Sequence, residues 1–527
     1  MAVDAENELP LVGARVQTDA DRGTVKFVGV IEGLRGEWVG VDWDDESRGK
    51  HDGSYKGRRY FRAKSGTSGS FVRPAKLEGG CSLLSAAAER YCDASTDSDR
   101  VEQIGAKQVE LVNMQKIHGK QNNLARLRHV ILDRTRVAFV GADDDDNGGQ
   151  LPACVELDLT RTLVYRWPDV FRLIHALKRL EILNLSRNRL LPLSDEDVDS
   201  ACRLFKHTSP PPLQTLVLND CGVSWAQAMR LYELLPKLKV LALAENGISC
   251  IGPELSDGGR FPSAALTSID LQSNPLGDFA NVLSLAHLPS LDALHLNKAG
   301  IPSIRLDVES PVVPFPALRI LYLRRNLIAD WASMDELDRL ASLEQLHLHG
   351  NPLYESAALQ TVRQMVIARI GGVCCLDRET VTTSERRGAE YDYLKAQAAD
   401  WFEAQESATT EQFYAAHPRF QRLVELHGPP GRPSAPPLAD GLLRKHLLGL
   451  ELQHDGRRLR KALPANMSVG TLRVLFCRLF GLPKGVSPAL CYQSGSQSGV
   501  VVKLENAVLQ LQYYGVEEGD LIRICDL

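Results

Sequence analysis

The sequence has 527 residues, which at ~150 residues per domain predicts three or four domains. It is 44% hydrophobic, enough for a sizeable core, and its net charge of −5 excludes a globally basic nucleic-acid-binding protein. No window holds about 18 uninterrupted apolar residues and the N-terminus is acidic, so we expect neither a membrane span nor a signal peptide. The 11 Cys follow no framework of spacings, which favours reduced thiols in a cytosolic protein.

The first unit, expected over residues 10–78, is rich in Gly and alternates Val, Phe, Trp and Tyr with polar residues. This pattern is typical of a small β-barrel with many turns. Residues 48–76 hold nine Lys or Arg and one Asp, a local excess of +8. Such an excess suits an acidic peptide, and the glycines would let its backbone approach closely.

Three motifs of this unit, Gly36-Glu37-Trp38-Val39-Gly40, Gly49-Lys50-His51-Asp52-Gly53 and Gly69-Ser70-Phe71, resemble those of the CAP-Gly family. The resemblance implies binding of partner chains that end in Glu-Glu-Tyr or Glu-Glu-Phe, including α-tubulin. It implies that the tail-binding residues are Trp38 and Phe71 as groove walls and, in the loop that meets the peptide, Gly49, Lys50, His51, Asp52 and Gly53.

Two positions of this unit qualify the resemblance. Gly33 stands five positions before Trp38, where many CAP-Gly domains have an aromatic residue, and this predicts a shallower pocket. Phe27 fits the alternation of a barrel strand, and we expect it in the barrel core rather than in the groove.

Residues 79–126 are predicted to form a helical connector. The pattern L-x-x-L-x-L-x-x-N then recurs nine times, with starts 25 to 33 residues apart from Leu127 to Leu343. It resembles leucine-rich repeats, and we expect an α/β solenoid with a C-terminal cap over residues 127–395. The central Leu-x-Leu is predicted to be a strand with both leucines inside, and the Asn to close the turn by hydrogen bonds to backbone groups. Where Cys or Thr replaces the Asn, we expect less complete closure.

The residue between the two strand leucines of each repeat should point out of the concave face. The candidate contact residues there are Asp270, His295, Tyr322 and His347, and in the next outward column Arg324 and His349. A mixed polar face of this kind suits a protein partner better than a small molecule. The histidines have no Cys or carboxylate at fixed spacing, so we predict no metal site.

Residues 396–437 are expected to be a helical and proline-rich linker. Residues 438–527 resemble ubiquitin-like domains, an α+β β-grasp fold, through Met467–Leu475, Gly481-Leu482-Pro483 and Gly519–Ile524. The chain ends without Gly-Gly, which predicts docking rather than conjugation. We find no P-loop, nucleophile elbow or H-E-x-x-H motif, so we expect no enzyme and no cofactor.

The order CAP-Gly, leucine-rich repeats, ubiquitin-like domain resembles the tubulin-folding cofactor E family. The resemblance implies a cytoplasmic, cytoskeleton-associated chaperone that binds α-tubulin and assembles or dissociates the tubulin heterodimer together with other tubulin-folding cofactors. Proteasome or ubiquitin receptors are further candidate partners; nucleic acid and membrane are not expected. The alternatives are a microtubule-associated CAP-Gly adaptor and a ubiquitin-pathway shuttle for tubulin.

Overall fold

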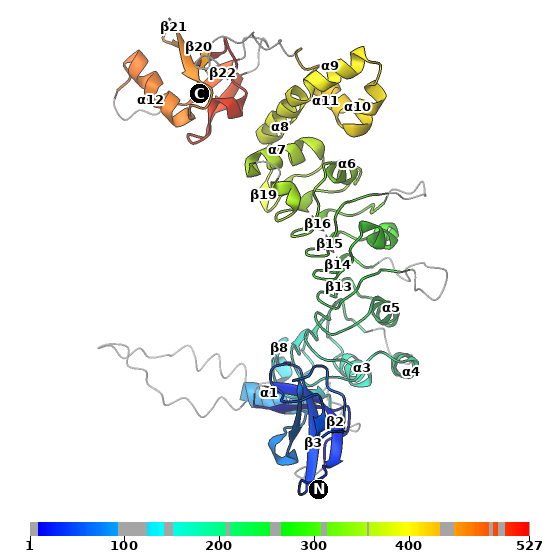
Figure 1. Ribbon diagram of the computed structural model, residues 1–527. Coiled ribbons are helices and arrows are strands. Elements are labelled where there is room, and N and C mark those ends of the chain that lie inside the picture. Colours follow the sequence, from blue (N-terminus) through cyan, green and yellow to red (C-terminus); the bar gives the residue numbers. More distant parts are fainter. Residues whose placement is uncertain are drawn as a thin grey trace, which may run out of the picture. The chain divides into compact units, whose positions relative to one another are not determined.

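The computed structural model describes residues 9–19, 21–92, 124–141, 151–206, 211–252, 265–306, 314–355, 358–432, 447–483, 488–493 and 501–525. The chain divides into two compact units. One consists of Met1–Ala358 with Gly372–Glu379, and the other of Leu359–Gly371 with Thr380–Leu527. Figure 1 shows the course of the chain.

The first unit begins with a four-stranded antiparallel sheet in the order β1-β2-β3-β6. Its strands, with a short hairpin, are β1 Arg15–Thr18, β2 Asp21–Val30, β3 Glu37–Trp43, β4 Ser54–Tyr55, β5 Arg58–Arg59 and β6 Gly69–Val72. Side chains alternate along β3, because successive residues of a strand face opposite sides. One side builds a core of Val16, Val25, Val39, Val41 and Trp43, and the other side carries the aromatic residues described below.

A short segment joins this sheet to the repeats. It contains η1 Pro74–Lys76, β7 Cys81–Ser82 and α1 Leu83–Cys92. β7 pairs in parallel with β9, Val137–Phe139, near the start of the repeats. Most of the predicted connector 79–126, namely residues 93–123, lies outside the described residues.

The repeats form a sheet of eleven strands in chain order, and β9 is not one of them. From β8 to β18, neighbouring strands of this sheet are parallel. The strands are β8 His129–Ile131, β10 Glu156–Asp158, β11 Ile182–Asn184, β12 Thr215–Val217, β13 Val240–Ala242, β14 Ser268–Asp270, β15 Ala293–His295, β16 Ile320–Tyr322, β17 Gln345–His347, β18 Cys375–Leu376 and β19 Glu379–Thr380. Figure 1 shows α3 Trp167–Ala176, α4 Asp195–Phe205, α5 Trp225–Leu234 and α6 Ala332–Asp338 on the side of the repeats opposite the strands. The remaining connections contain η2 Leu124–Arg126, η4 Phe279–His287 and η5 Pro352–Glu355.

The predicted role of the repeat asparagines is confirmed. Asn274 donates from Nδ2 to the carbonyls of Leu243 and Leu271, at 2.9 and 3.0 Å. Its Oδ1 accepts from the backbone N–H of Asn246 and Ile248, at 3.0 Å each. Each such Asn therefore joins two coils and satisfies backbone groups that are buried between them.

Cys221 takes the Asn position in one repeat. Its Sγ donates to the carbonyl of Leu185 at 3.1 Å, and burial raises the pKa of the thiol to about 12, so it stays protonated. A thiol supplies a single donor, where an Asn side chain supplies two.

The second unit opens with helices that pack on one another: α7 Leu359–Arg369, α8 Thr383–Ala396, α9 Ala398–Glu406, α10 Thr410–Ala416 and α11 Phe420–His427. The side chains of Trp401, Phe413 and Phe420 are buried among them. Glu390 of α8 is also buried and accepts hydrogen bonds from Arg419 at 2.6 Å and His427 at 2.7 Å. The segment 398–427, which we expected to be part of a linker, is thus a packed helical layer, because its aromatic residues bury together.

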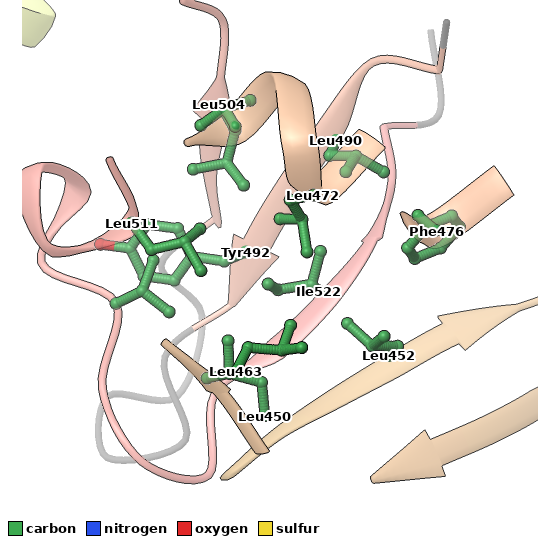
Figure 2. Close-up of a cluster of buried hydrophobic side chains, with 12 residues drawn as sticks. Leu450, Leu452, Leu463, Leu472, Phe476, Leu490, Tyr492, Leu504, Leu511 and Ile522 are labelled. Atoms are coloured by element: carbon green, nitrogen blue, oxygen red, sulfur yellow. The ribbon is translucent and has the colours of Figure 1, made fainter. Parts of the chain in front are cut away.

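The ubiquitin-like part has five strands in the order β21-β20-β24-β22-β23. The elements are β20 Leu447–His454, β21 Arg457–Pro464, α12 Val469–Phe480, β22 Leu490–Gln493, β23 Val501–Leu504, η6 Leu511–Tyr514 and β24 Leu521–Ile524. Figure 2 shows α12 side chains such as Leu472 beside Leu450, Leu463 and Ile522 of the sheet in one buried cluster. Ser468 caps the helix start, and Gly481 ends it with a φ of 68°.

The predicted fold class is confirmed: a small β-barrel unit, a leucine-rich-repeat solenoid and a β-grasp domain. No helix among the described residues is long and apolar enough to cross a membrane.

Candidate peptide-binding site

A surface of aromatic residues, which we call the groove after the resemblance to CAP-Gly domains, lies on the face of the barrel sheet opposite its core. Phe27 of β2 and Phe71 of β6 both pair with Gly40 of β3, so the three residues form one row across the sheet. A Cβ atom at Gly40 would lie 2.5 Å from a ring carbon of Phe61. Because Gly40 has no side chain, the Phe61 ring can rest directly on the sheet and form part of the groove floor.

Phe71 is the centre of an aromatic cluster. Its ring centroid lies 6.3 Å from Phe27, 5.6 Å from Tyr60, 5.5 Å from Phe61 and 4.7 Å from His51. The three pairs with Phe27, Tyr60 and Phe61 are edge-to-face, an arrangement that aromatic rings favour. Phe71, Phe27, Tyr60 and His51 are each only partly buried, so the cluster presents ring surface to a ligand.

The loop Gly49–Gly53 borders this cluster and needs both glycines. A Cβ at Gly49 would lie 2.3 Å from the carbonyl oxygen of Thr67, and Gly53 has a φ of +95° and comparable crowding from Phe61. Between them, Lys50 and His51 donate their backbone N–H groups to the carbonyl of Gly69, at 2.7 and 3.1 Å. The loop is thereby fixed against β6, and the Lys50 side chain is exposed.

His51 has a defined orientation in this loop. Its Nδ1 accepts a hydrogen bond from the backbone N–H of Gly53 at 3.0 Å. In the neutral ring the proton is therefore on Nε2, which can donate to a ligand. Partial burial lowers the pKa of His51, with Asp52 acting in the opposite direction, which keeps the ring neutral at neutral pH.

Asp52 holds the loop rather than facing a ligand. Its carboxylate accepts from the backbone N–H of Ser54 at 3.1 Å and from Arg59 at 2.8 Å. Hydrogen bonds from Ser54, and then from Arg59, hold the pKa of this carboxyl below its usual value.

Trp38 lies on the same face as Gly40, one step further along β3, beside Gly29 of β2. The guanidinium carbon of Arg73 sits 3.9 Å from its ring centroid, a cation–π contact. In the described part of the chain, its buried Nε1 has no hydrogen-bond partner. Trp38 therefore stands next to the Phe71 cluster, with one ring face covered by Arg73.

Gly33 brings no aromatic side chain to this surface, and the neighbouring Tyr60 supplies one instead. Gly33 has a φ of +82°, which disfavours an aromatic residue there, and a Cβ would meet only the Lys56 ammonium at 3.8 Å. The nearby Tyr60 hydroxyl accepts the backbone N–H of Glu32 at 2.9 Å. Tyr60 thus fixes this loop and supplies ring surface to the cluster.

The positive charge of residues 48–76 is partly neutralised. Ion pairs join Arg48 to Asp21, Arg58 to Glu32, Arg59 to Asp52 and Lys64 to Glu46. Within the described ranges, Lys50, Lys56 and Arg62 are exposed and form no ion pair, so a net positive charge remains around the groove.

On the repeats, three predicted concave residues form a stack. The rings of His295 and Tyr322 lie 4.1 Å apart and those of Tyr322 and His347 4.4 Å apart, each pair nearly parallel. Asp270 pairs with His295 in the neighbouring strand. Burial lowers the pKa of His295, and Asp270 opposes this shift. The stack runs across β15, β16 and β17, and the three rings cover one another's faces.

His347 differs from expectation, because it is only 3% exposed. Tyr322 covers one of its ring faces, and Arg324 Nη2 lies 3.3 Å from its Nδ1. Arg324 also lies 3.5 Å from Asp377, whose carboxylate accepts the backbone N–H of His349 at 3.1 Å. His347 therefore supports Tyr322 and Arg324 rather than offering a contact surface itself. No metal-binding group of three or more His, Cys, Asp or Glu occurs among the described residues.

Comparison with known proteins agrees with this architecture. The model of the CAP-Gly domain family matches residues 12–77. Tubulin-specific chaperone E from Bos taurus is 35% identical, with 98% of both chains covered. The chain belongs to the tubulin-specific chaperone E family. The Homo sapiens protein is 33% identical over 98% of both chains. A solved ubiquitin-like domain of mouse tubulin-specific chaperone E is 31% identical, and covers 16% of this chain and 90% of that one with a TM-score of 0.14.

In this member of the tubulin-specific chaperone E family, sequence reasoning missed part of the groove. Phe27 was expected in the core, and this is wrong: it contacts Tyr60 and Phe71 on the opposite face of the sheet. Tyr60 and Phe61 were not selected, although the run Gly57–Phe61 offered a signal. The bulge in β2 between Val25 and Phe27 changes which face the following residues occupy, and alternation alone does not reveal it.

Proposed function

We propose that this chain is a tubulin-folding chaperone. Its CAP-Gly groove would bind the C-terminal tail of α-tubulin, its repeats would contact the folded body, and together they would help assemble or dissociate the α/β-tubulin heterodimer. The observation that carries the proposal is the aromatic groove around Phe71, in a chain of the tubulin-specific chaperone E family.

The groove has the chemistry that an acidic tail with a terminal aromatic residue requires. Phe27, Tyr60 and Phe71 offer ring surfaces for the aromatic side chain. The Nε2–H of His51 and the ammonium of Lys50 can donate to carboxylates, and charge-assisted bonds of this kind are the stronger ones.

The concave face would contact the tubulin body. The His295–Tyr322 stack and the Arg324–Asp377 pair give a surface that is aromatic in its centre and polar at its edge, an arrangement typical of protein interfaces. Of the predicted concave residues, we propose Asp270, His295, Tyr322, Arg324 and His349 as contacts, with His347 in support.

Two linked sites would raise each other's effective concentration. The barrel is joined to the repeats through β7 and β9, and Arg22 donates to the backbone carbonyl of Arg134. Engaging the tail and the body at once would load the interface between α- and β-tubulin, and we propose this strain as the way the heterodimer opens. We place this non-enzymatic activity in the cytoplasm with the cytoskeleton. Other tubulin-folding cofactors are proposed partners, and the ubiquitin-like domain is a proposed docking module for ubiquitin or proteasome receptors.

Size-exclusion chromatography with tubulin dimers tests the proposal, with tubulin lacking the last α-tubulin residue as the matched control. We expect a soluble complex that contains α-tubulin and little β-tubulin, and a weaker complex with the truncated tubulin. If no soluble complex forms but the protein sediments with microtubules, the adaptor function is correct instead. If the isolated repeats dissociate tubulin as well as the full chain does, the two-site mechanism is wrong.

A further inference from the structure

The residue before each repeat Asn, or its substitute, has a left-handed backbone. In three successive repeats this residue is an arginine: Arg134, Arg161 and Arg187, with φ of 59°, 58° and 60°. Arg134 N–H donates to Thr160, Arg161 N–H to Ser186 and Arg187 N–H to Asn219, at 2.9, 2.9 and 2.7 Å. The three residues therefore stand on adjacent coils, about 4.8 Å apart at the backbone. We call them the arginine column.

The arginine column is exposed to solvent. All three side chains are exposed, and no ion pair to them occurs in the described ranges. The next coil ends the column with Asp220, which already pairs with Arg189 at 3.0 Å. Three like charges at this spacing repel one another, so an anion would stabilise them.

The barrel adds further positive charge beside the column. Arg22 is 8% exposed and donates to the backbone carbonyl of Arg134, while its Nε has no acceptor in the described part. The nearest barrel carboxylate, Asp44, is taken up by two hydrogen bonds from Arg15. Burial lowers the pKa of Arg22, and the neighbouring cations Arg161 and Arg15 lower it further, which places Arg22 close to the column.

The direction of β3 leads from the groove toward the arginine column. Gly40, under the aromatic cluster, is followed on the same face by Asp42 and then Asp44, whose N–H donates to the carbonyl of Arg22 at 2.9 Å. Four residues of strand span about 13 Å. An extended peptide that begins in the groove would therefore reach the column after about four to six residues.

We propose that the arginine column binds the acidic residues that precede the terminal aromatic residue of the tail held in the CAP-Gly groove. The inference rests on the proposed function and extends it. The groove would bind the end of the tail, and the arginine column would bind the acidic residues upstream of that end. An acidic peptide fits better than a nucleic acid, because the column continues a groove that suits a peptide end.

The test uses the full chain and two peptides that end in Glu-Glu-Tyr, one short and one with about eight additional glutamates upstream. We expect the wild-type protein to bind the long peptide about tenfold more tightly at low salt, and this advantage to shrink as salt rises. The double variant Arg161→Glu, Arg187→Glu should lose the advantage and bind the short peptide with unchanged affinity. Glu is tolerated at this backbone position, because Glu245 occupies it with a φ of 61°.

The control is Lys237→Glu, Lys239→Glu, the same change of charge at exposed sites outside the column. It should leave binding of both peptides unchanged. The inference is overturned if the arginine variant binds the long peptide like wild type, or if it loses both peptides equally. It is also overturned if a single-stranded oligonucleotide binds the column as tightly as the long peptide. Failure of the wild-type protein to bind the short peptide would instead contradict the proposed function.

Discussion

At the scale of single residues, the groove depends on positions where a side chain is missing as much as on those where one is present. Gly40 lets Phe61 lie on the sheet, and Gly49 and Gly53 let the loop approach β6 and Phe61. His51 takes part in closing this loop. Its Nδ1 accepts from Gly53 N–H as the side-chain oxygen of an Asn would, so the turn keeps its geometry.

Phe71→Ala should weaken binding of a Glu-Glu-Tyr peptide by about 10- to 100-fold, because Phe71 contacts every other ring of the cluster. Peptide titration of the full chain measures this, and Phe71→Leu, which keeps volume but not the ring, should fall between. Phe139→Ala, at a ring 42% exposed outside the groove, is the matched control and should bind like wild type. Equal affinity of Phe71→Ala and Phe139→Ala would remove the aromatic cluster from the proposed site.

We expect the stability of the loop Gly49–Gly53 to depend on pH through His51. Its folded-state pKa is lowered, so the folded protein binds this proton less tightly than the unfolded chain does. The stability it contributes is therefore present above the unfolded value of about 6.5 and is lost as the pH falls through the folded value. Protection of the Gly53 amide against hydrogen exchange, corrected for intrinsic rates, should decrease from pH 7 to 5.5. His51→Asn keeps an acceptor that does not titrate there and should retain protection; a parallel decrease in this variant would contradict the assignment.

At the scale of elements, the repeats share one set of hydrogen bonds, from the repeat Asn to backbone groups of two coils. A repeat without this Asn is tolerated where the Asn residues of the adjacent coils bind the same carbonyls. Ala299 replaces an Asn, yet the carbonyls that an Asn would bind, of Leu271 and Leu296, still accept from Asn274 and Asn326, at 3.0 and 2.8 Å. The sequence predicted the role of the Asn. Each carbonyl can accept a hydrogen bond from an Asn of its own coil or of the adjacent coil, and this follows only from the stacking of the coils.

Asn326→Ala should destabilise the repeats by about 3 kcal/mol or more. The substitution leaves the N–H groups of Ala299 and Ile301 buried without their acceptor, and Leu296 without its side-chain donor. Urea unfolding followed by circular dichroism measures the change. Asn297→Ala is the control and should cost less, because among the described residues the Asn297 Oδ1 accepts a hydrogen bond from Arg324 N–H alone. Equal losses would mean that the Asn position has no special role.

At the scale of the whole molecule, the proposed function depends on how the barrel meets the repeats. Gly80 lies in close contact with this junction, since a Cβ there would lie 2.2 Å from the Cβ of Ala138 in β9. Its neighbour Gly79 has open space around it. The sequence showed a barrel followed by repeats, but this contact joins residues far apart in the chain and is absent from any local pattern.

Gly80→Val should weaken binding of the tubulin heterodimer by about tenfold, because a side chain there forces β7 away from β9 and reduces the effective concentration of the second site. Affinity for the short tail peptide should not change, since the groove is untouched. Gly79→Val is the matched control and should behave like wild type in both titrations. If Gly80→Val binds tubulin normally, the two sites do not act together through this junction.

Local patterns in the sequence predict the three kinds of domain, the period and inward leucines of the repeats, and the glycine loop with Lys50 and His51. These follow from local rules: alternation in strands, a fixed repeat length, and glycine where the backbone must come close. Three features depend instead on tertiary packing: Phe27, Tyr60 and Phe61 gather around Phe71, His347 is covered, and helices 398–427 form a packed layer. Tertiary packing also places Arg22 beside Arg134. Each of these depends on a strand bulge, a stacking or a contact between distant segments, and the free energy of such contacts is set by packing, which no local pattern encodes.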